Sequence, residues 1–268
     1  MIKIRKIKQS DKERILRISS KIWEGNDYIP DVFDEWIKRK DKIFVCIEDN
    51  HIVQGMANIT IMPDGVLWFE GLRVDVDARG RGYGDMLNKY LIEEAKKRGR
   101  IIRLSTYFHN YESIHIIEKS GFKKIKRYLL VEKNVRKINI KYNLVKCDID
   151  DIDFIPVEWT FYKNNMDNNK YIRKNIHCLA HDDNTICLSG DISRRQVSVL
   201  NIFKINFRKR DNLNIMFNMA ESFAFDNGYK GLATILPYSA GILDESLKYG
   251  FELWEKTKTN VFLYEKYL

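Results

Sequence analysis

The chain has 268 residues, of which 44% are hydrophobic and 31% charged, as in folded globular proteins and unlike disordered or fibrous chains. At roughly 150 residues per domain, this length predicts one large domain or two modest ones. No stretch approaches the ~20 consecutive apolar residues of a membrane span, the first residues are basic, and the four cysteines form no C-x-x-C pair. These features predict a cytoplasmic protein with reduced cysteines and no disulfide framework.

The formal net charge of +9 raises the question of nucleic-acid binding. Residues 1–133 carry 27 basic and 20 acidic side chains (+7), and the remainder carries 19 and 17 (+2). The basic runs are short, as at residues 38–40, 96–98 and 123–127, which is more typical of solvated helix ends and loops than of a binding stripe. Neither a nucleic-acid partner nor a membrane partner is therefore expected.

The first half alternates between strand and helix periodicity. Strands are expected at residues 2–7, 42–48, 52–61, 66–74, 101–107 and around 123–132. Helices are expected from residue 10 to about 22, at 32–40, from a glycine-rich loop to about 98, and at 112–119. Ser10 and Glu13 have the spacing of a capping box at the first helix. This order predicts an α/β fold with a mixed, mostly antiparallel sheet flanked by helices.

The second half repeats parts of the first. Lys119-Ser120-Gly121-Phe122 recurs as Lys248-Tyr249-Gly250-Phe251, an offset of 129 residues, and Gly99 matches Gly228 at the same offset. The strand-like residues 142–147 also resemble residues 2–7. A duplication is therefore expected, with a boundary near residues 133–143 and two domains at 1–135 and 140–268.

The segment with the clearest chemical signal is Arg79-Gly80-Arg81-Gly82-Tyr83-Gly84, which lies between a predicted strand and a predicted helix. Glycines allow backbone N–H groups to approach a phosphate, and the start of the helix adds the positive end of its dipole. The physical expectation is a cradle for a pyrophosphate. The following strand has no acidic residue for a ribose, and no Lys-Ser or Lys-Thr follows the glycines, so neither a Rossmann turn nor a Walker loop is indicated.

This segment matches the [RQ]-x-x-G-x-[GA] signature of the GNAT N-acetyltransferase superfamily, and Asn110 and Gly121-Phe122 follow at similar spacings. The resemblance covers roughly residues 2–133. It implies a GNAT fold, with acetyl-CoA as co-substrate, followed by a second, degenerate GNAT-like copy. The cofactor-binding residues that it implies are Leu72, Arg73 and Val74 on the strand, Arg79, Gly80, Arg81, Gly82, Tyr83 and Gly84 in the loop, and Asn110 beside the pantetheine arm. It also implies that Gly71 marks a bulge that separates two strands.

Acetyl transfer to an amine needs a base, and the resemblance places Glu70 in that role. The family's tyrosine, four residues before Gly-Phe, is replaced here by Ile117. Tyr111, Ser113 or His115 could serve the leaving thiolate instead, or it could leave unassisted into solvent. No metal site is expected: His177 and His181 have helical spacing without a further ligand, which favours a surface helix.

The family selects its acceptor with the first two helices and their connecting loop, which here offer Trp23, Tyr28 and Trp36. Aromatic residues and carboxylates together suit an amine, although Trp23 and Trp36 could equally be core anchors. The string Asp-Tyr-Ile-Pro at residues 27–30, with Trp36 and with residues 70–74, resembles the histidine N-acetyltransferase-like subgroup.

The glycine loop is lost from the second copy. Residues 79–84 correspond to Arg208-Lys209-Arg210-Asp211-Asn212-Leu213, Glu70 to Val199 and Asn110 to Ser239. The expected activity is therefore acetyl transfer, in the first copy, to a primary amine such as a free amino acid, by a monomer or homodimer. The alternatives are a protein N-terminus or another macromolecular acceptor, and a non-catalytic acyl-CoA sensor.

Overall fold

The computed structural model describes residues 1–190, 199–208, 212–253 and 260–268. Contacts divide the chain into two units, one comprising residues 1–104, 110–123 and 264–268, the other residues 105–109 and 124–263. Each is described below by itself.

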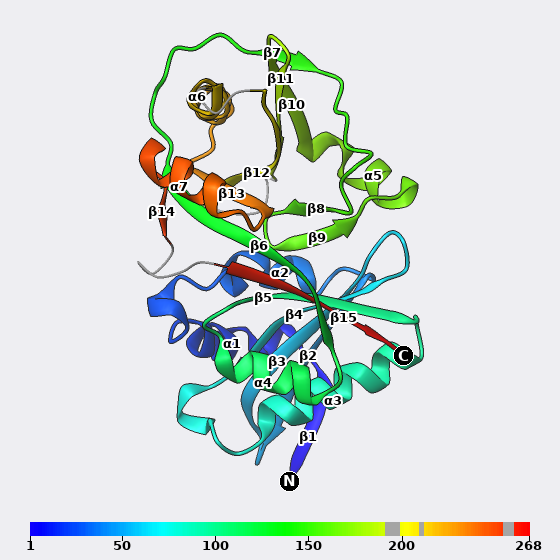
Figure 1. Cartoon of the computed structure of the whole chain (residues 1–268). Helices are drawn as coiled ribbons and strands as arrows, with labels where there is room; N and C mark the ends of the chain where they lie inside the picture. The colour runs from blue at the N-terminus through cyan, green and yellow to red at the C-terminus, as the bar shows by residue number, and fades with distance from the viewer. Residues whose placement is uncertain (191–198, 209–211, 254–259) are drawn as a thin grey trace. The chain divides into compact units, whose positions relative to one another are not determined.

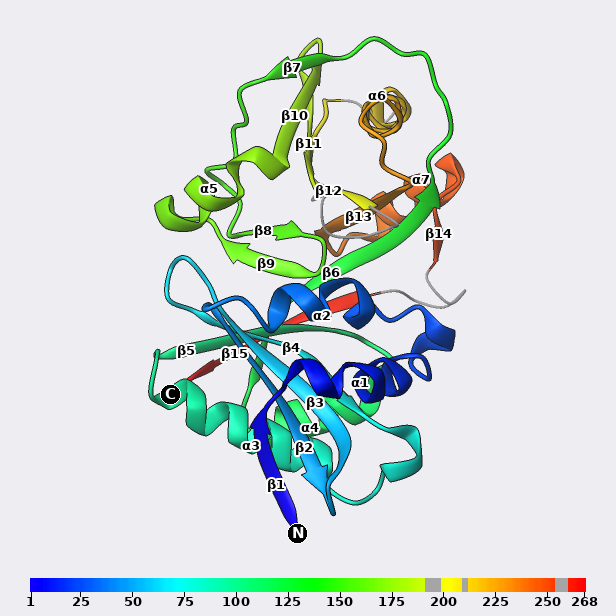
Figure 2. The same cartoon turned by 180° about the vertical axis from the view of Figure 1, so that it is seen from behind.

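Unit 1 is an α/β unit whose helices cover both faces of a sheet. Its strands are β1 (Ile2–Lys6), β2 (Lys42–Asp49), β3 (Ile52–Ile61), β4 (Leu67–Val74) and the start of β5 (Ile101–Tyr107), and its α-helices are α1 (Lys12–Ser19), α2 (Ile29–Trp36), α3 (Tyr83–Lys96) and α4 (Tyr111–Lys119). Strands β1 to β4 pair antiparallel in chain order, and β5 is parallel to β4. Helices α3 and α4 lie on one face (Figure 1), and α1 and α2 on the other (Figure 2).

The helix boundaries differ from the predictions at the amino-terminal end. Ser10 lies in a short 3₁₀ turn, and the N-cap residue of α1 is Asp11. The Asp11 carboxylate accepts a hydrogen bond from the Lys8 N–H at 2.8 Å. The predicted Ser10–Glu13 capping box is therefore wrong. Helix α2 begins at Ile29, three residues earlier than predicted, because Pro30 occupies a first-turn position where its missing N–H costs nothing.

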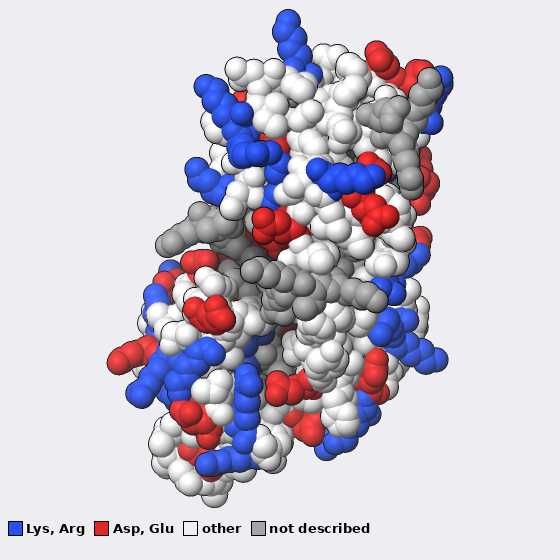
Figure 3. All heavy atoms as spheres, turned by 60° about the vertical axis from the view of Figure 1, so that its left-hand side comes forward, with Lys and Arg blue, Asp and Glu red and all other residues white. Residues whose placement is uncertain are grey.

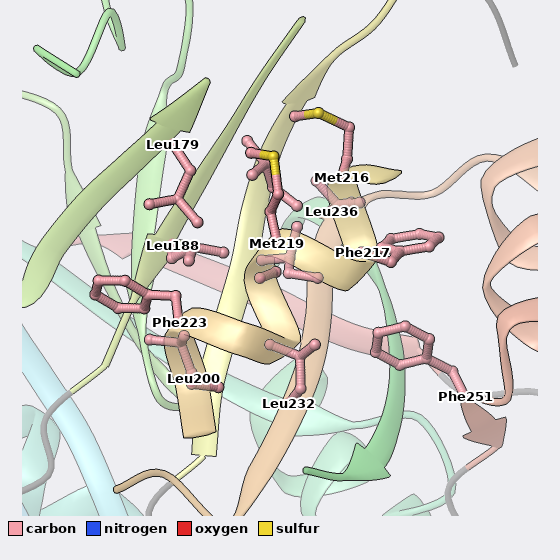
Figure 4. Packing of buried hydrophobic residues seen from close by; sticks show 14 of the residues in the cluster. Leu179, Leu188, Leu200, Met216, Phe217, Met219, Phe223, Leu232, Leu236 and Phe251 are labelled. Carbon is pink, nitrogen blue, oxygen red and sulfur yellow. The ribbon is translucent and has the colours of Figure 1, made fainter. Parts of the chain in front are cut away.

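Unit 2 is also a mixed sheet with helices. Its strands are β6 (Lys123–Asn134), β7 (Asn143–Val145), β8 (Phe154–Val157), β9 (Thr160–Lys163), β10 (Ile176–His181), β11 (Asn184–Ser189), β12 (Val199–Asn206), β13 (Gly231–Pro237), β14 (Glu252–Leu253) and the first half of β15 (Asn260–Tyr267). Its α-helices are α5 (Met166–Ile172), α6 (Asn212–Asp226) and α7 (Ala240–Tyr249). Figure 4 shows its core: Met216, Phe217, Met219 and Phe223 of α6 pack with leucines of β10 to β13 and with Phe251.

The element order of unit 1 recurs in unit 2. Strands β10, β11 and β12 are followed by α6, β13 and α7, as β2, β3 and β4 are followed by α3, β5 and α4. Strand β12 pairs with β13 in parallel, as β4 does with β5, and β7 pairs antiparallel with β10, as β1 does with β2. The mixed, mostly antiparallel sheet predicted from the sequence is confirmed in both units.

The units are not two consecutive stretches of sequence. Residues of β6 that follow Lys123 lie in unit 2, where β6 pairs antiparallel with β13. Residues 264–268 lie in unit 1, where the Leu268 N–H donates to the Arg100 carbonyl and Arg103 pairs with Glu265 at 2.7 Å. The last residues of the chain thus contribute a buried ion pair to the first unit.

Two interpretations of unit 2 need correction. His177 and His181 lie on strand β10, not on a helix, because Ile176–His181 pairs antiparallel with β11. The same pairing places Cys178 opposite Cys187, and the two form a disulfide with Cα atoms 4.2 Å apart. The expectation of no disulfide was wrong because the partner of Cys178 is set by strand register, which a search for C-x-x-C spacing does not detect.

Candidate functional site

Strand β4 carries a bulge at Gly71. Glu70 faces Asn58 of β3 and Arg73 faces Met56, so two residues of β4, Gly71 and Leu72, oppose one residue of β3. Gly71 has φ +67°, and a Cβ there would lie 3.0 Å from Cζ3 of Trp36. Glycine is required both by the left-handed backbone and by the close approach of the indole ring. The bulge predicted at Gly71 is confirmed.

The bulge lies beside an opening between two strands. Strand β4 pairs with β5 only at Leu67 and Trp68, so its remaining residues, including Leu72 and Val74, make no ladder bonds to β5. An extended ligand could use the backbone groups of such an unpaired edge as an additional strand would.

The glycine-rich loop forms an open cradle at the start of α3. Gly80 and Gly82 have φ +78° and +77°, and a Cβ at either would meet no atom within 4 Å. The first α-helical bond at this end joins the Met86 N–H to the Gly82 carbonyl, so the preceding N–H groups of the first turn are free of that ladder. A Cβ at Gly84 would lie 3.0 Å from Cδ1 of Ile116, so this glycine allows α3 to pack against α4. The loop fits a phosphate group in shape and polarity.

The acidic residues beside the loop are neutralised, which keeps the cradle suited to an anion. Asp75, whose side chain is 3% exposed, pairs with Arg14 at 2.5 Å and Lys21 at 3.2 Å, and Lys21 also pairs with Asp77. Arg79 and Arg81 are exposed loop cations. An open cavity of about 370 Å³ borders this segment, lined by Arg14, Arg17, Lys21, Ile52, Gln54, Asp75, Asp77, Ala78 and Arg81.

Tyr83, the last non-glycine residue of the motif, has a structural contact. Its ring is buried, and its hydroxyl donates to Oδ2 of Asp49 at 2.8 Å, which raises the pKa of the phenol. The side chain thus fixes the start of α3 to the end of β2.

Glu70 lies immediately before the bulge, with a side chain 17% exposed. Its Oε1 atom accepts hydrogen bonds from Lys42 at 3.1 Å, from Asn58 at 2.9 Å and from the hydroxyl of Thr60. A half-buried carboxylate on the part of β4 that does not pair with β5 can act as a proton acceptor. Sequence reasoning found Glu70 but missed its three donors, which depend on strand register.

Two of the three aromatic residues predicted to bind substrate surround a buried ion pair. Arg73 lies 4.3 Å from the ring centroid of Trp23 and 5.5 Å from that of Tyr28. It also binds Asp27 in a bidentate manner, at 2.9 and 3.2 Å, and Asp27 is fully buried. The Arg73 side chain therefore anchors the loop between α1 and α2, and a role of Arg73 in cofactor binding stays a prediction. Trp23 remains half exposed on this loop.

Trp36 is a core residue. It is 4% exposed and packs edge-to-face against Phe44 at 5.1 Å and Tyr28 at 5.9 Å. In the predicted acceptor region, the Trp23 side chain is thus exposed and that of Tyr28 partly buried, whereas Trp36 packs against Tyr28 from the core.

The first turn of α4 holds the remaining candidates. Asn110 is the N-cap residue, and its side chain accepts a hydrogen bond from the Ser113 N–H at 3.4 Å. Tyr111 is 68% exposed, and Ile117, at the position of the family's tyrosine, is buried. Arg79 of the loop lies 3.8 Å from Glu112, so the loop and the start of α4 are neighbours.

Other site types find no support. Within the described ranges, no three His, Cys, Asp or Glu side chains gather as metal ligands. Among the described helices none has the length and apolar character needed to cross a membrane. On the face shown in Figure 3, basic and acidic side chains are interspersed and form no continuous basic stripe.

Comparisons with known proteins agree with this geometry. The acetyltransferase (GNAT) family model matches residues 9–122. A histidine N-acetyltransferase of Xenopus tropicalis is 28% identical over 127 residues, which cover 45% of this chain and 36% of the relative. A histidine N-acetyltransferase of Oreochromis niloticus is 24% identical over 121 residues, 42% and 36% of the two chains. The chain thus aligns with only about a third of the length of these relatives.

Solved structures match over the whole length. A structure from Thermoplasma acidophilum has a TM-score of 0.66 at 13% identity, with 100% of both chains covered. A GCN5-related N-acetyltransferase from Sphaerobacter thermophilus has a TM-score of 0.66 at 11% identity, over 99% of this chain and 95% of that one. These similarities concern the fold. Residues 9–122, which contain the bulged strand and the glycine cradle, thus match the GNAT acetyltransferase family, whose members use acetyl-CoA as co-substrate.

Proposed function

We propose that this protein is an acetyl-CoA-dependent N-acetyltransferase that acts on a primary amine, specifically a free amino acid or similar small amine. The observation that carries the proposal is the arrangement along β4: a carboxylate at Glu70, a bulge at Gly71, an unpaired strand edge, and then an open glycine cradle at the start of α3. These features, in this order, match the needs of a thioester whose long arm ends in a pyrophosphate.

Acetyl-CoA would be held by backbone rather than by charged side chains. The pyrophosphate fits the Gly80 and Gly82 cradle, where Arg79 and Arg81 add positive charge. The pantetheine arm would bond to backbone groups of Leu72 and Val74, and Asn110 and the start of α4 would border it. Arg73 contributes through its backbone, because its side chain is committed to Asp27.

The chemistry requires that the nitrogen lose its protons as the acyl group moves. An amine that arrives as ammonium gives one proton to Glu70, which exposes the nitrogen lone pair. The nitrogen then forms a bond to the thioester carbonyl carbon, and the carbon–sulfur bond breaks. The sulfur leaves as thiolate and takes up a proton from a donor side chain, and the nitrogen loses its second proton to become an amide. That second proton restores the donor side chain, and Glu70 releases the first proton to solvent. Tyr111 and Ser113 are proposed donors to the thiolate, since they lie in the first turn of α4.

Small amines are favoured over macromolecular acceptors by two observations. The acceptor loop offers Trp23 and Tyr28 around a buried Arg73–Asp27 pair, and the aligned relatives include histidine N-acetyltransferases. On the face shown in Figure 3 the basic and acidic side chains are interspersed, which argues against a nucleic-acid acceptor bound at that face.

Unit 2 is proposed to be a degenerate GNAT-like copy, on the repeated element order and the parallel β12–β13 pair. At the sequence offset of 129 residues Val199 corresponds to Glu70, so this copy is expected to lack the carboxylate. Of the segment that corresponds to the glycine loop, residues 209–211 lie outside the described residues. The two domains, 1–135 and 140–268, the monomer or homodimer and the cytoplasmic location remain predictions.

The test separates cofactor binding from turnover. Gly82→Val should weaken CoA binding at least about tenfold, whereas Gly65→Val, which also replaces a glycine of positive φ (+79°) in open space, should not. Glu70→Gln should bind CoA normally and lose turnover. Binding without turnover on free amino acids, polyamines and peptides would favour an acyl-CoA sensor, and steep loss of activity with salt would favour a tRNA-linked acceptor.

A further inference from the structure

Three polar residues converge on Glu70 on the α2 side of the sheet. Strand register pairs Asn58 with Glu70 and Lys42 with Thr60, and directly opposed residues share one face of a sheet. Asn58 and Thr60 are two positions apart on β3, so they point to that same face. Lys42, Asn58, Thr60 and Glu70 therefore form one cluster, on four positions of three adjacent strands.

All of the donors in this cluster contact the same oxygen of Glu70. Lys42 Nζ, Asn58 Nδ2 and the Thr60 hydroxyl each donate to Oε1. Lys42 also donates to Thr60 Oγ1 at 2.6 Å, and Asn58 Nδ2 lies 3.1 Å from that atom. Among the described residues nothing donates to Oε2. The carboxylate is thus held by one oxygen only.

The saturation of Oε1 determines where a proton can go. A carboxylate oxygen has two lone pairs, and three donors already occupy the space around Oε1. We propose that Lys42, Asn58 and Thr60 are positioning residues that hold Oε1 so that Oε2 alone faces the acceptor and takes its proton. This inference rests on the proposed function, because it assigns an atom and a supporting set to the same base.

Two observations argue that the cluster serves Glu70 rather than the substrate or the fold. The Lys42 side chain is only 8% exposed, and its Nζ atom lies 4.8 Å from the ring centroid of Trp36. The same atom donates hydrogen bonds to Glu70 and Thr60, so the ammonium group is poorly placed to bind an acceptor carboxylate. Asn58 is fully buried, and its Oδ1 atom has no partner within the described part of the chain. A buried unpaired oxygen costs stability, so the amide is retained for what its Nδ2 atom does.

The matched pair Thr60→Val and Thr60→Ser tests the proposal. Valine removes the hydroxyl at nearly constant volume, and serine retains it. Thr60→Val should lower kcat at least about tenfold, in keeping with loss of a hydrogen bond to a charged group, with KM for acetyl-CoA within about twofold of wild type. Thr60→Ser should stay within about threefold of wild-type kcat. Equal kcat values for the two variants would overturn the proposal.

A double-mutant cycle distinguishes positioning from a general structural effect. In a Glu70→Gln background, Thr60→Val should cause no further loss of the residual rate, since the oxygen that it positions is no longer a base. A further tenfold loss, of the order seen in wild type, would refute the inference. If Thr60→Val does not fold, Lys42→Met against Lys42→Arg decides by the same criteria. Absence of wild-type turnover on any amine would instead refute the proposed function.

Discussion

The close packing of Gly71 against Trp36 at the candidate site makes a quantitative prediction. Gly71→Ala forces an L-residue into φ +67°, at a cost of about 1–2 kcal/mol. The added methyl group also lies 3.0 and 3.2 Å from two indole carbons of Trp36, which is buried and cannot move freely. Overpacking of this kind costs about 1–3 kcal/mol. Unit 1 should therefore lose about 2–5 kcal/mol of unfolding free energy.

Gly65→Ala is the matched control. Gly65 has φ +79°, and a Cβ there meets no atom within 4 Å, so this variant should lose only about 1–2 kcal/mol. The gain from reduced freedom of the unfolded chain is common to both variants and cancels in their difference. The difference, about 1–3 kcal/mol, isolates the contact with Trp36.

Hydrogen exchange of β3 and β4 amides under native conditions gives the free energy of opening of this unit directly. Equal opening free energies for Gly65→Ala and Gly71→Ala would show that Trp36 does not restrict residue 71, and the packing argument would fail.

Three further predictions concern stability. Glu265→Ala should destabilise unit 1 by about 3–5 kcal/mol in denaturant unfolding, because it removes the carboxylate that pairs with the buried Arg103 guanidinium. Glu112→Ala at the exposed Arg79 pair should change the unfolding free energy by less than about 1 kcal/mol, and equal effects of the two variants would contradict the buried pairing. The hydrogen bond from Arg5 lowers the pKa of Asp11 in the folded protein. The contribution of Asp11 to the free energy of unfolding should therefore be complete above the pKa of an unfolded aspartate, about 3.9, and should be lost as the pH falls below that value. Asp11→Asn should flatten that part of a stability–pH curve, and an unchanged curve would refute the assignment. In the denatured protein without reductant, an alkylating reagent should modify Cys46 and Cys147 only, and it should modify Cys178 and Cys187 only after reduction. Alkylation of Cys178 and Cys187 without reductant would exclude the disulfide.

Local patterns predicted most of the strands of unit 1, the long helix α3 and the bulge at Gly71, because each depends on neighbouring residues or on a family motif. The cap of α1 was misassigned because Ser10 and Asp11 are both good capping residues and the Lys8–Asp11 bond decides between them. His177 and His181 were misread because spacing of four residues does not distinguish a helix from a strand in which tertiary pairing dominates.

Contacts between distant segments were beyond prediction. The donors to Glu70 come from the two neighbouring strands β2 and β3, and only strand register brings Lys42 and Thr60 to its carboxylate. The Arg73 side chain is held by Asp27, which lies 46 residues earlier in the chain. Glu265 pairs with Arg103 across 162 residues. In each case the partner is fixed by the fold and not by a local pattern.

The most direct test of the central claim is the stoichiometry of acetyl transfer by the purified full-length protein. Free thiol released from acetyl-CoA and N-acetylated product should be quantified together over a panel of free amino acids, polyamines and short peptides. The account predicts that thiol appears with a free amino acid or similar small amine, in an amount equal to the N-acetyl product, and that Glu70→Gln lowers both to a small residual rate. Thiol release that does not depend on an amine, or full activity in Glu70→Gln, would contradict it.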